Sequence, residues 1–339
     1  MEKSISQITC ENEHKYLSEY AAFADKSEGR LREEEECNIR TCYQRDRDRI
    51  IHCNSFRRLK HKTQVFLSPE GDYYRTRLTH TLEVAQIART IAVALRLNEN
   101  LTEAIALGHD LGHTPFGHSG EEVLNEIHPG GFRHNVQSLR VVDLLESGSS
   151  SRRGMNLTFE VRDGILNHTG STMPETPEGQ VVKTSDRIAY INHDIDDAMR
   201  SGIITLDDLP EESIAVLGDT HKKRIDTLVK DMIENSYGRP EAKLSREKSE
   251  AMNELRTYMF RNVYHNEQVK RAEDVSKVRV IITSLYEYYL DHPESLSEEL
   301  LSMVDEFPME DLVKDHIAGM TDRYAVNTYN ELFVAKGWR

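Results

Sequence analysis

Hydrophobic residues along this chain recur mainly at helical spacing, and segments that alternate apolar and polar residues like a β-strand are scarce. The sequence LTHTLEVAQIARTIAVALRLNEN (78–100) predicts a helix with one face in the core and with Asn98 or Asn100 as its terminator. The apolar positions of this face are Leu78, Leu82, Ala85, Ala88, Ala92 and Leu95. A second helix is expected after Thr102, and the glycine-rich sequence GHTPFG should end it, which places His109 and Asp110 near a helix C-terminus.

The helical pattern continues through the rest of the chain. FRHNVQSLRVVDLLE (132–146) predicts a helix, and two polar stretches (147–156 and 169–180) predict loops before the strongly helical residues 181–200. From about Leu206, amphipathic segments alternate with polar connections, without an internal repeat. We therefore expect an all-α protein with an N-terminal segment (1–40), a helical core (41–205) and a C-terminal helical extension (206–339) packed on that core.

Composition narrows the class of protein. The 339 residues are 38% hydrophobic and 30% charged, which is enough apolar material for one large core or two domains. No segment approaches the roughly 18 to 20 apolar residues of a membrane span, and the N-terminus lacks an apolar export segment. The cysteines Cys10, Cys37, Cys42 and Cys53 have no CxxC spacing, so we expect reduced thiols in a cytoplasmic protein without membrane contact.

The formal net charge of −15 argues against broad nucleic-acid binding, so any anionic ligand must be gathered by a local cluster of cations. One basic segment could form a phosphate pocket, or it could be a solvated helix face that answers the acidic run REEEE (32–36). Its cations are Arg45, Arg47, Arg49, Arg57, Arg58, Lys60, Lys62, Arg75 and Arg77.

The sequence GHDLGHTPFGHSGE (108–121) concentrates histidines and carboxylates between glycines. A buried face would have to supply a partner for each of these groups, so a purely structural role for the whole segment is costly. Further along, Asp186, Tyr190 and Asp194 fall at i, i+4 and i+8 of a predicted helix and share one face. The residues Ile188, Ile191 and Ile195 lie toward another face, which is expected in the core.

Mixed imidazole and carboxylate ligands are typical of borderline divalent metal ions that keep open positions for water and substrate. His80, the adjacent pair His109 and Asp110, and Asp186 could form such a set. An HD dipeptide alone is weak evidence, because a single histidine is more often a partnered structural residue. Composition does not select His80 from the fifteen histidines of the chain.

Five sequences taken together resemble one known family: RLTHTLEVAQIAR, GHDLGHTPFGHSGE, FRHNVQSLRVV, SDRIAYINHDIDDA and IAGMTDRYA. They are similar to the HD-domain deoxynucleoside triphosphate triphosphohydrolases, the bacterial dGTPase-like proteins, and the resemblance runs from about Arg45 to Phe333. It implies an HD-domain helical core in which a metal ion and a deoxynucleoside triphosphate meet. Water would attack the α-phosphorus, and the products would be the deoxynucleoside and tripolyphosphate.

The resemblance also implies roles for individual residues. The metal ligands would be His80, His109, Asp110 and Asp186. The catalytic pair would be His118 and Glu121, in which the carboxylate orients an imidazole that transfers a proton. A general-acid role for His118 toward the departing 5′ oxygen is favoured over a general-base role toward water. His113 would assist as an α-phosphate contact, and His134 would be a weaker one.

Substrate contacts follow from the same resemblance. Arg77 and Arg187 would bind the triphosphate, whereas the deoxyribose would be read by Gln64, Tyr190 and Asp194. The metal could be Mn²⁺, Mg²⁺ or iron. A homo-oligomer, either hexamer or tetramer, and an activating deoxynucleotide at a separate site are expected.

Two alternatives remain open at this stage. An HD phosphohydrolase could act on another nucleotide, such as a nucleoside 5′-monophosphate or a cyclic dinucleotide, because the four metal ligands alone do not identify the substrate. A nucleotide-sensing or nucleic-acid-binding regulator could also retain the fold. The complete metal set and the pair His118 and Glu121 favour catalysis, and the acidic balance disfavours nucleic acid.

Overall fold

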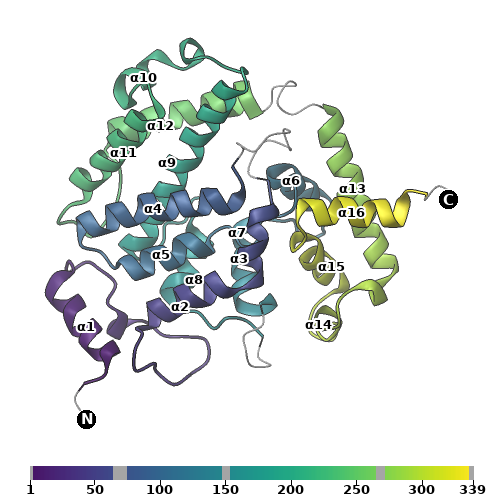
Figure 1. The fold of residues 1–339 in the computed structure, drawn as a ribbon, viewed down its shortest axis with the longest axis horizontal. Coiled ribbons are helices and arrows are strands. Elements are labelled where there is room, and N and C mark those ends of the chain that lie inside the picture. The colour runs from purple at the N-terminus through teal and green to yellow at the C-terminus, as the bar shows by residue number, and fades with distance from the viewer. Residues whose placement is uncertain (1–2, 64–74, 147–152, 265–271, 336–339) are drawn as a thin grey trace.

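The computed structural model describes residues 3–63, 75–146, 153–264 and 272–335. Within these ranges the chain consists of helices joined by turns and loops (Figure 1), and the extended pairings are the isolated bridges Arg30–Thr158 and Thr63–Thr76. The prediction of an all-α fold is confirmed. None of the described helices has both the length and the apolar content needed to cross a membrane.

The first helices along the chain are α1 (Ile5–Tyr16), α2 (Cys42–His52), α3 (Asn54–Arg58), α4 (Arg77–Leu95), α5 (Glu99–Gly108), α6 (Gly117–Ile127), α7 (His134–Arg140) and α8 (Phe159–Asn167). The later helices are α9 (Pro177–Arg200), α10 (Glu211–Leu217), α11 (His221–Ser236), α12 (Arg246–Met259), α13 (Ala272–Asp291), α14 (Glu298–Leu301), α15 (Met309–Ala318) and α16 (Asp322–Phe333). Short 3₁₀ or π segments are η1 (Ala24–Lys26), η2 (Leu59–His61), η3 (Val141–Leu145), η4 (Leu206–Asp208), η5 (Phe260–Tyr264) and η6 (Pro293–Ser295).

Helices α4, α5 and α9 form the centre of the larger hydrophobic core, because α4 packs against both of the others (Figure 1). Helices α2 and α8 also pack on α5, while α11 and α12 pack on α9. The predicted apolar face of α9 is confirmed, since Ile188, Ile191 and Ile195 are buried. Each such side chain contributes roughly 1.5–3 kcal/mol through burial, so this core holds the three helices in one relative position.

The C-terminal helices α13, α15 and α16 build a second hydrophobic cluster on the other side of α6. From the first half of the chain this cluster takes Phe116, Val123, Leu124 and Phe132. Helix α6 packs directly on α13, whereas α10, α11 and α12 belong to the larger core. The histidine-rich segment 108–121 therefore passes from one core to the other.

The boundary between α4 and α5 differs from the prediction. Helix α4 ends before Arg96, which adopts a left-handed conformation with φ of 55°. Asn98 does not terminate α4 but caps α5, where its side-chain oxygen accepts a hydrogen bond from the backbone N–H of Leu101 at 3.3 Å. Helix α5 consequently begins before Thr102. Leu82, which was assigned to the core face, is 51% exposed.

The starts of two other helices also differ from the prediction. Helix α9 begins four residues before the predicted start at residue 181, because Thr176 caps it through the backbone N–H of Gly179. The helix predicted over 132–146 begins at His134 and continues from α7 into the π-helical segment η3. The predicted loop at 147–156 lies partly outside the described residues.

Candidate active site

Three helices carry the residues that the sequence predicts as metal ligands. His80 lies in the first turn of α4, His109 caps the C-terminus of α5 with Asp110 next to it, and Asp186 lies in the middle of α9. Because α4 packs on both α5 and α9, their side chains converge. We call these four residues the His/Asp cluster.

The distances within the His/Asp cluster are short. His80 Nε2 lies 3.1 Å from Asp186 Oδ1, while His109 Nε2 lies 3.5 Å from Asp110 Oδ1 and 3.8 Å from Asp186 Oδ1. His80, His109 and Asp110 are at most 3% exposed. Each of these three offers a ligand atom within 4.8 Å of the other two. The fold thus brings the four predicted residues together in a buried position.

The hydrogen bonds of His109 show that the cluster suits a cation. Its Nδ1 lies 2.6 Å from the carbonyl oxygen of Ala106, and a carbonyl can only accept, so Nδ1 carries the proton. The buried Nε2 therefore presents a lone pair to the two carboxylates and has no hydrogen-bond partner among the described residues. His109 Nε2, Asp110 Oδ1 and Asp186 Oδ1 are three electron-rich atoms that face one another in a buried position. A divalent ion between them would satisfy all three.

The charges of the two carboxylates support the same interpretation. Burial alone would raise the pKa of Asp186, but the hydrogen bond with His80 lowers this pKa to about 2. Burial likewise opposes ionisation of Asp110, yet the ion pair with Arg77 holds its pKa well below the usual value. Both carboxylates are therefore ionised at neutral pH and can act as ligands.

Arg77 is fixed against this cluster. Its Nη1 donates to Asp110 Oδ2 at 2.7 Å, its Nη2 donates to the carbonyl oxygen of Thr63 at 3.3 Å, and the residue is 1% exposed. Asp110 therefore divides its oxygens, with Oδ2 toward Arg77 and Oδ1 toward the histidines. The predicted contact of Arg77 with a triphosphate stays a prediction.

A second group of polar side chains lies beside the cluster. Glu121 Oε1 accepts hydrogen bonds from the backbone N–H and from Nδ1 of His134, both at 2.9 Å. Glu121 Oε2 lies 3.5 Å from Nδ1 of His118, whose side chain is 65% exposed. His113 stacks on His134 with ring centroids 4.2 Å apart, and its Nε2 lies 3.7 Å from Asp110 Oδ1. His113 therefore links the two groups.

Glu121 is held as a carboxylate in this arrangement. Burial would raise its pKa, but the hydrogen bonds with His118 and His134 lower that pKa far below the ordinary value. The same contact with Glu121 outweighs burial at His134 and raises its pKa. The predicted pair of His118 and Glu121 is thus present at a longer distance, while the closer partner of Glu121 is His134.

The turn that carries His113 and His118 is tied to the C-terminal helices. Helix α6 starts from a left-handed conformation at Phe116 (φ of 63°), whose backbone N–H donates to Asp322 Oδ1 at 2.9 Å. Lys62 donates to the carbonyl oxygens of His113 and Ala318. The sequence IAGMTDRYA, which carried part of the family resemblance, therefore anchors the turn from outside.

The polar face of α9 extends away from Asp186. Tyr190 is half-buried against the larger core, and Asp194 is 2% exposed. Arg187 donates to the side chain of Asn253 on α12. Gln64 lies outside the described residues. The sugar and phosphate roles predicted for these four residues stay predictions.

His168 is a site residue that the sequence did not indicate. It follows α8, is 2% exposed, and places its Nε2 3.3 Å from Nε2 of His134, while its ring edge meets His109 at 5.0 Å between centroids. Its sequence context, ILNHTG, contains no motif that would distinguish it. Only the packing of α8 against α5 and α7 brings it to the site.

Much of the basic segment is used in ion pairs. Arg45 and Arg49 pair with Glu34 at 3.2 and 2.8 Å, and Arg75 pairs with Asp197 at 2.7 Å. Arg45 and Arg49 therefore answer the acidic run 32–36, as one of the two alternatives for this segment expects, whereas Arg75 pairs with a carboxylate of α9.

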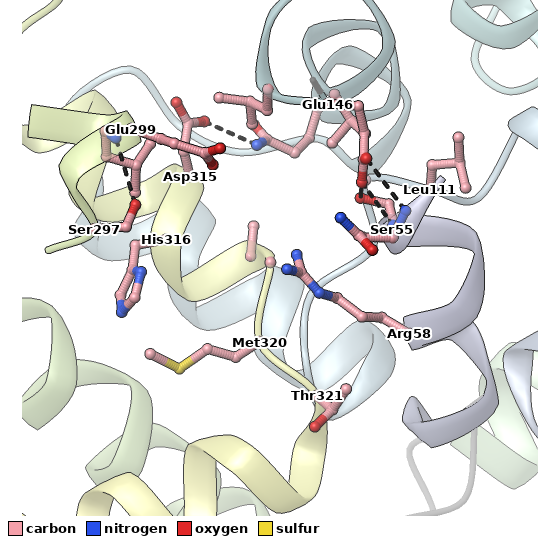
Figure 2. A pocket seen from close by; sticks show the side chains of 18 of the residues that line it. Ser55, Arg58, Leu111, Glu146, Ser297, Glu299, Asp315, His316, Met320 and Thr321 are labelled. Atoms are coloured by element: carbon pink, nitrogen blue, oxygen red, sulfur yellow. Dashed lines mark hydrogen bonds between the residues drawn. The ribbon is translucent and has the colours of Figure 1, made fainter. Parts of the chain in front are cut away.

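A cavity of about 450 Å³ lies behind the histidine-rich turn, between α3 and the C-terminal helices. Leu111 and Gly112 form part of its wall, and Figure 2 shows Arg58 directed into it. Its lining contains none of the His/Asp cluster. The cavity is therefore separate from the cluster, although Leu111 in its wall directly follows Asp110.

Comparisons with known proteins identify the family of this chain. The HD domain model matches residues 77–191, and the phosphohydrolase-associated domain model matches residues 242–331. A deoxyguanosinetriphosphate triphosphohydrolase-like protein of Caldanaerobacter subterraneus is 58% identical, over 98% of this chain and 97% of that protein. Proteins with the same description from Clostridium perfringens and Desulfatibacillum aliphaticivorans are each 49% identical, over 94% of this chain and 95% of each relative. The chain therefore belongs to the HD-domain family of deoxyguanosinetriphosphate triphosphohydrolase-like proteins.

Proposed function

We propose that this protein is a metal-dependent triphosphohydrolase that converts deoxynucleoside triphosphates, either dGTP or a broader set, to deoxynucleoside and tripolyphosphate. The observation that carries the proposal is the buried His/Asp cluster, with His109 Nε2 within 4 Å of both Asp110 and Asp186. Its relatives are named as deoxyguanosinetriphosphate triphosphohydrolase-like proteins, which supports a nucleotide substrate.

The His/Asp cluster would hold one divalent ion, for which Mn²⁺, Mg²⁺ and iron all suit the mixed nitrogen and oxygen donors. When bound, such an ion supplies Lewis acidity toward an α-phosphate oxygen and lowers the pKa of a water molecule. The residues themselves keep this position dry, since three of them are at most 3% exposed.

His118 would transfer the proton that the leaving group needs. Its exposed ring can reach a substrate, and Glu121 orients it from the buried side. As water forms a bond to the α-phosphorus, the bond from that phosphorus to the 5′ oxygen breaks, and His118 gives this oxygen a proton. In the alternative, His118 takes a proton from the attacking water and acts as a general base instead of a general acid.

The remaining residues would bind the substrate. His113 and, more weakly, His134 would contact the α-phosphate, and Arg77 and Arg187 would supply positive charge for the triphosphate. The deoxyribose would lie along the polar face of α9, against Tyr190 and Asp194, with Gln64 completing the contact. We also expect a homo-oligomer, hexameric or tetrameric, and activation by a second deoxynucleotide.

A product analysis tests the proposal. The purified protein is incubated with each deoxynucleoside and ribonucleoside triphosphate, alone and in pairs, with Mn²⁺, Mg²⁺, Fe²⁺ or EDTA. Chromatography should show deoxynucleoside and tripolyphosphate, and in H₂¹⁸O the label should enter tripolyphosphate only. Monophosphate and pyrophosphate, or cleavage of a cyclic dinucleotide alone, would assign a different phosphohydrolase activity. His128→Ala is a matched control for His118→Ala, because His128 lies in the second hydrophobic cluster beside Tyr286.

A further inference from the structure

His168 occupies a position that the proposed reaction does not yet use. It ends α8 and is buried, with its Nδ1 2.7 Å from the carbonyl oxygen of Ile165 and its Nε2 3.3 Å from Nε2 of His134. The other nitrogen of His134, Nδ1, contacts Glu121 at 2.9 Å. A continuous series of polar contacts therefore runs from Ile165 through the two histidines to Glu121.

The number of protons in this series follows from the acceptors at its ends. A carbonyl oxygen only accepts, so Nδ1 of His168 is a donor, and an ionised carboxylate only accepts, so Nδ1 of His134 is also a donor. If both rings were neutral, two Nε2 lone pairs would face each other at 3.3 Å in a buried place. One proton between them turns this repulsion into a hydrogen bond.

The environment decides which ring carries that proton. His134 Nδ1 lies 2.9 Å from the Glu121 carboxylate, whereas Nδ1 of His168 contacts the neutral carbonyl of Ile165. The adjacent negative charge of Glu121 stabilises an imidazolium at His134, and His168 has no such partner at its Nδ1. His134 is therefore the donor and His168 the acceptor.

This hydrogen bond controls the orientation of Glu121. With Nε2–H directed at His168, the ring of His134 cannot turn, so Nδ1–H and the backbone N–H both remain on Glu121 Oε1. The other oxygen, Oε2, then faces Nδ1 of His118 at 3.5 Å. The stacked ring of His113 covers one side of His134.

We infer that His168 is a positioning residue that accepts a hydrogen bond from His134 and thereby holds the Glu121 carboxylate against His118. The inference rests on the proposed function, because His118 acts only in that reaction. A histidine that merely filled space would be replaced by a ring of similar size without consequence for the proton transfer.

Two substitutions separate the hydrogen bond from the packing. His168→Phe keeps an aromatic ring beside His109 and removes the acceptor, whereas His168→Gln can place an amide oxygen near the position of Nε2. His128→Phe, in the second hydrophobic cluster, is the control for loss of a buried histidine. Melting temperature and bound metal are measured for every variant, because the ring of His168 touches His109.

In the metal-loaded enzyme, His168→Phe should lower kcat roughly tenfold to a hundredfold, the usual effect of removing a residue that orients a catalytic group. The KM for the best deoxynucleoside triphosphate should change by less than about twofold, and His168→Gln should recover most of the loss. In a Glu121→Gln background, His168→Phe should cost little more, because its effect passes through the carboxylate. With ¹⁵N-histidine labelling, the Nε2 proton of His134 should be downfield in the wild type and lost from that region in His168→Phe, whereas the Nδ1 proton of His134 that is bonded to Glu121 should remain in both.

The outcomes distinguish the two proposals. A wild-type protein that hydrolyses no deoxynucleoside triphosphate overturns the proposed function. The Nε2 proton of His134 then still tests whether His134 donates a hydrogen bond to His168. The inference is overturned if the enzyme is active and His168→Phe keeps its kcat with normal metal content. Equal losses in His168→Phe and His168→Gln, or a loss that multiplies fully with Glu121→Gln, also overturn it. A downfield Nε2 proton of His134 that persists in His168→Phe overturns it as well.

Discussion

Substitution of Asp110 can separate its predicted role as a metal ligand from its role in the fold. Its Oδ2 accepts from Arg77 at 2.7 Å, in an ion pair whose side chains are 2% and 5% exposed, while Oδ1 faces His109. Asp110→Ala removes both contacts. Asp110→Asn keeps an oxygen that can accept from Arg77, but a neutral amide is a far weaker ligand for a divalent ion.

The contacts of Asp110 determine how much free energy of unfolding each of the two substitutions should cost. Removing one partner of a buried ion pair costs about 3–5 kcal/mol. Arg77 keeps its hydrogen bond to the Thr63 carbonyl, so we expect the lower end, about 3 kcal/mol, for Asp110→Ala. Asp110→Asn should lose about 1–2 kcal/mol, because a hydrogen bond to a charged group remains. Both variants should stay folded, since domains of ordinary stability have about 5–15 kcal/mol.

The assay measures folding and metal separately. Urea unfolding in EDTA gives the free energy of unfolding without metal, and elemental analysis after reconstitution with Mn²⁺ gives the bound ion. Both variants should bind little metal and lose turnover by at least about a hundredfold. Asp226→Ala, which removes an exposed ion pair with Lys230, is the matched control and should behave as the wild type.

The stabilising role of Asp110 and its role as a metal ligand can be refuted separately. If Asp110→Ala unfolds within about 1 kcal/mol of the wild type, the buried pair with Arg77 does not stabilise the fold as described. If Asp110→Asn retains a full complement of metal and normal turnover, Asp110 is not a ligand.

Three further predictions follow from other parts of the molecule. Gly112→Ala should lower both melting temperature and activity, because its Cβ would lie 2.1 Å from the backbone nitrogen of Ser138; Gly130→Ala, which meets only a side chain at 3.2 Å, should be mild, and equal melting temperatures would contradict this. Glu178 is buried, which raises its pKa from 4.5 to about 7, so the folded state binds more protons between these values and stability should fall by about 3 kcal/mol as pH rises through that window. Glu178→Gln should remove this slope in urea unfolding at pH 4.5 to 7, and an unchanged slope would assign it to another group. Tyr190→Ala should shift the ratio of kcat/KM for dGTP and GTP toward GTP by roughly tenfold to a hundredfold, the effect of about 1–3 kcal/mol, and an unchanged ratio would place sugar discrimination elsewhere.

Local patterns in the sequence were sufficient for the helical class, whereas the four residues of the His/Asp cluster were selected by the family resemblance. The repeat of apolar positions predicted α4 and the core face of α9, and the glycines after Asp110 predicted the end of α5. Such features depend on residues a few positions apart, for which helix geometry is known in advance. The family resemblance, which runs from about Arg45 to Phe333, is confirmed by the relatives.

Helix boundaries were harder to predict from the sequence, because several neighbouring residues can cap a helix. Asn98 and Thr176 are both good caps, and the sequence did not show that Asn98 begins α5 rather than ending α4. Leu82 fits the apolar periodicity of α4 and yet faces solvent, because which sides of a helix are covered depends on its neighbours.

Only the tertiary structure decided which distant groups meet at the site. Periodicity places a side chain on one face of its own helix, but the packing of α8 on α5 and α7 determines that His168 faces His134. The same holds for the hydrogen bond of His134 to Glu121 and for the pairing of Arg77 with Asp110. These contacts span 13 to 34 residues in sequence, and their geometry depends on how whole helices pack around two hydrophobic cores.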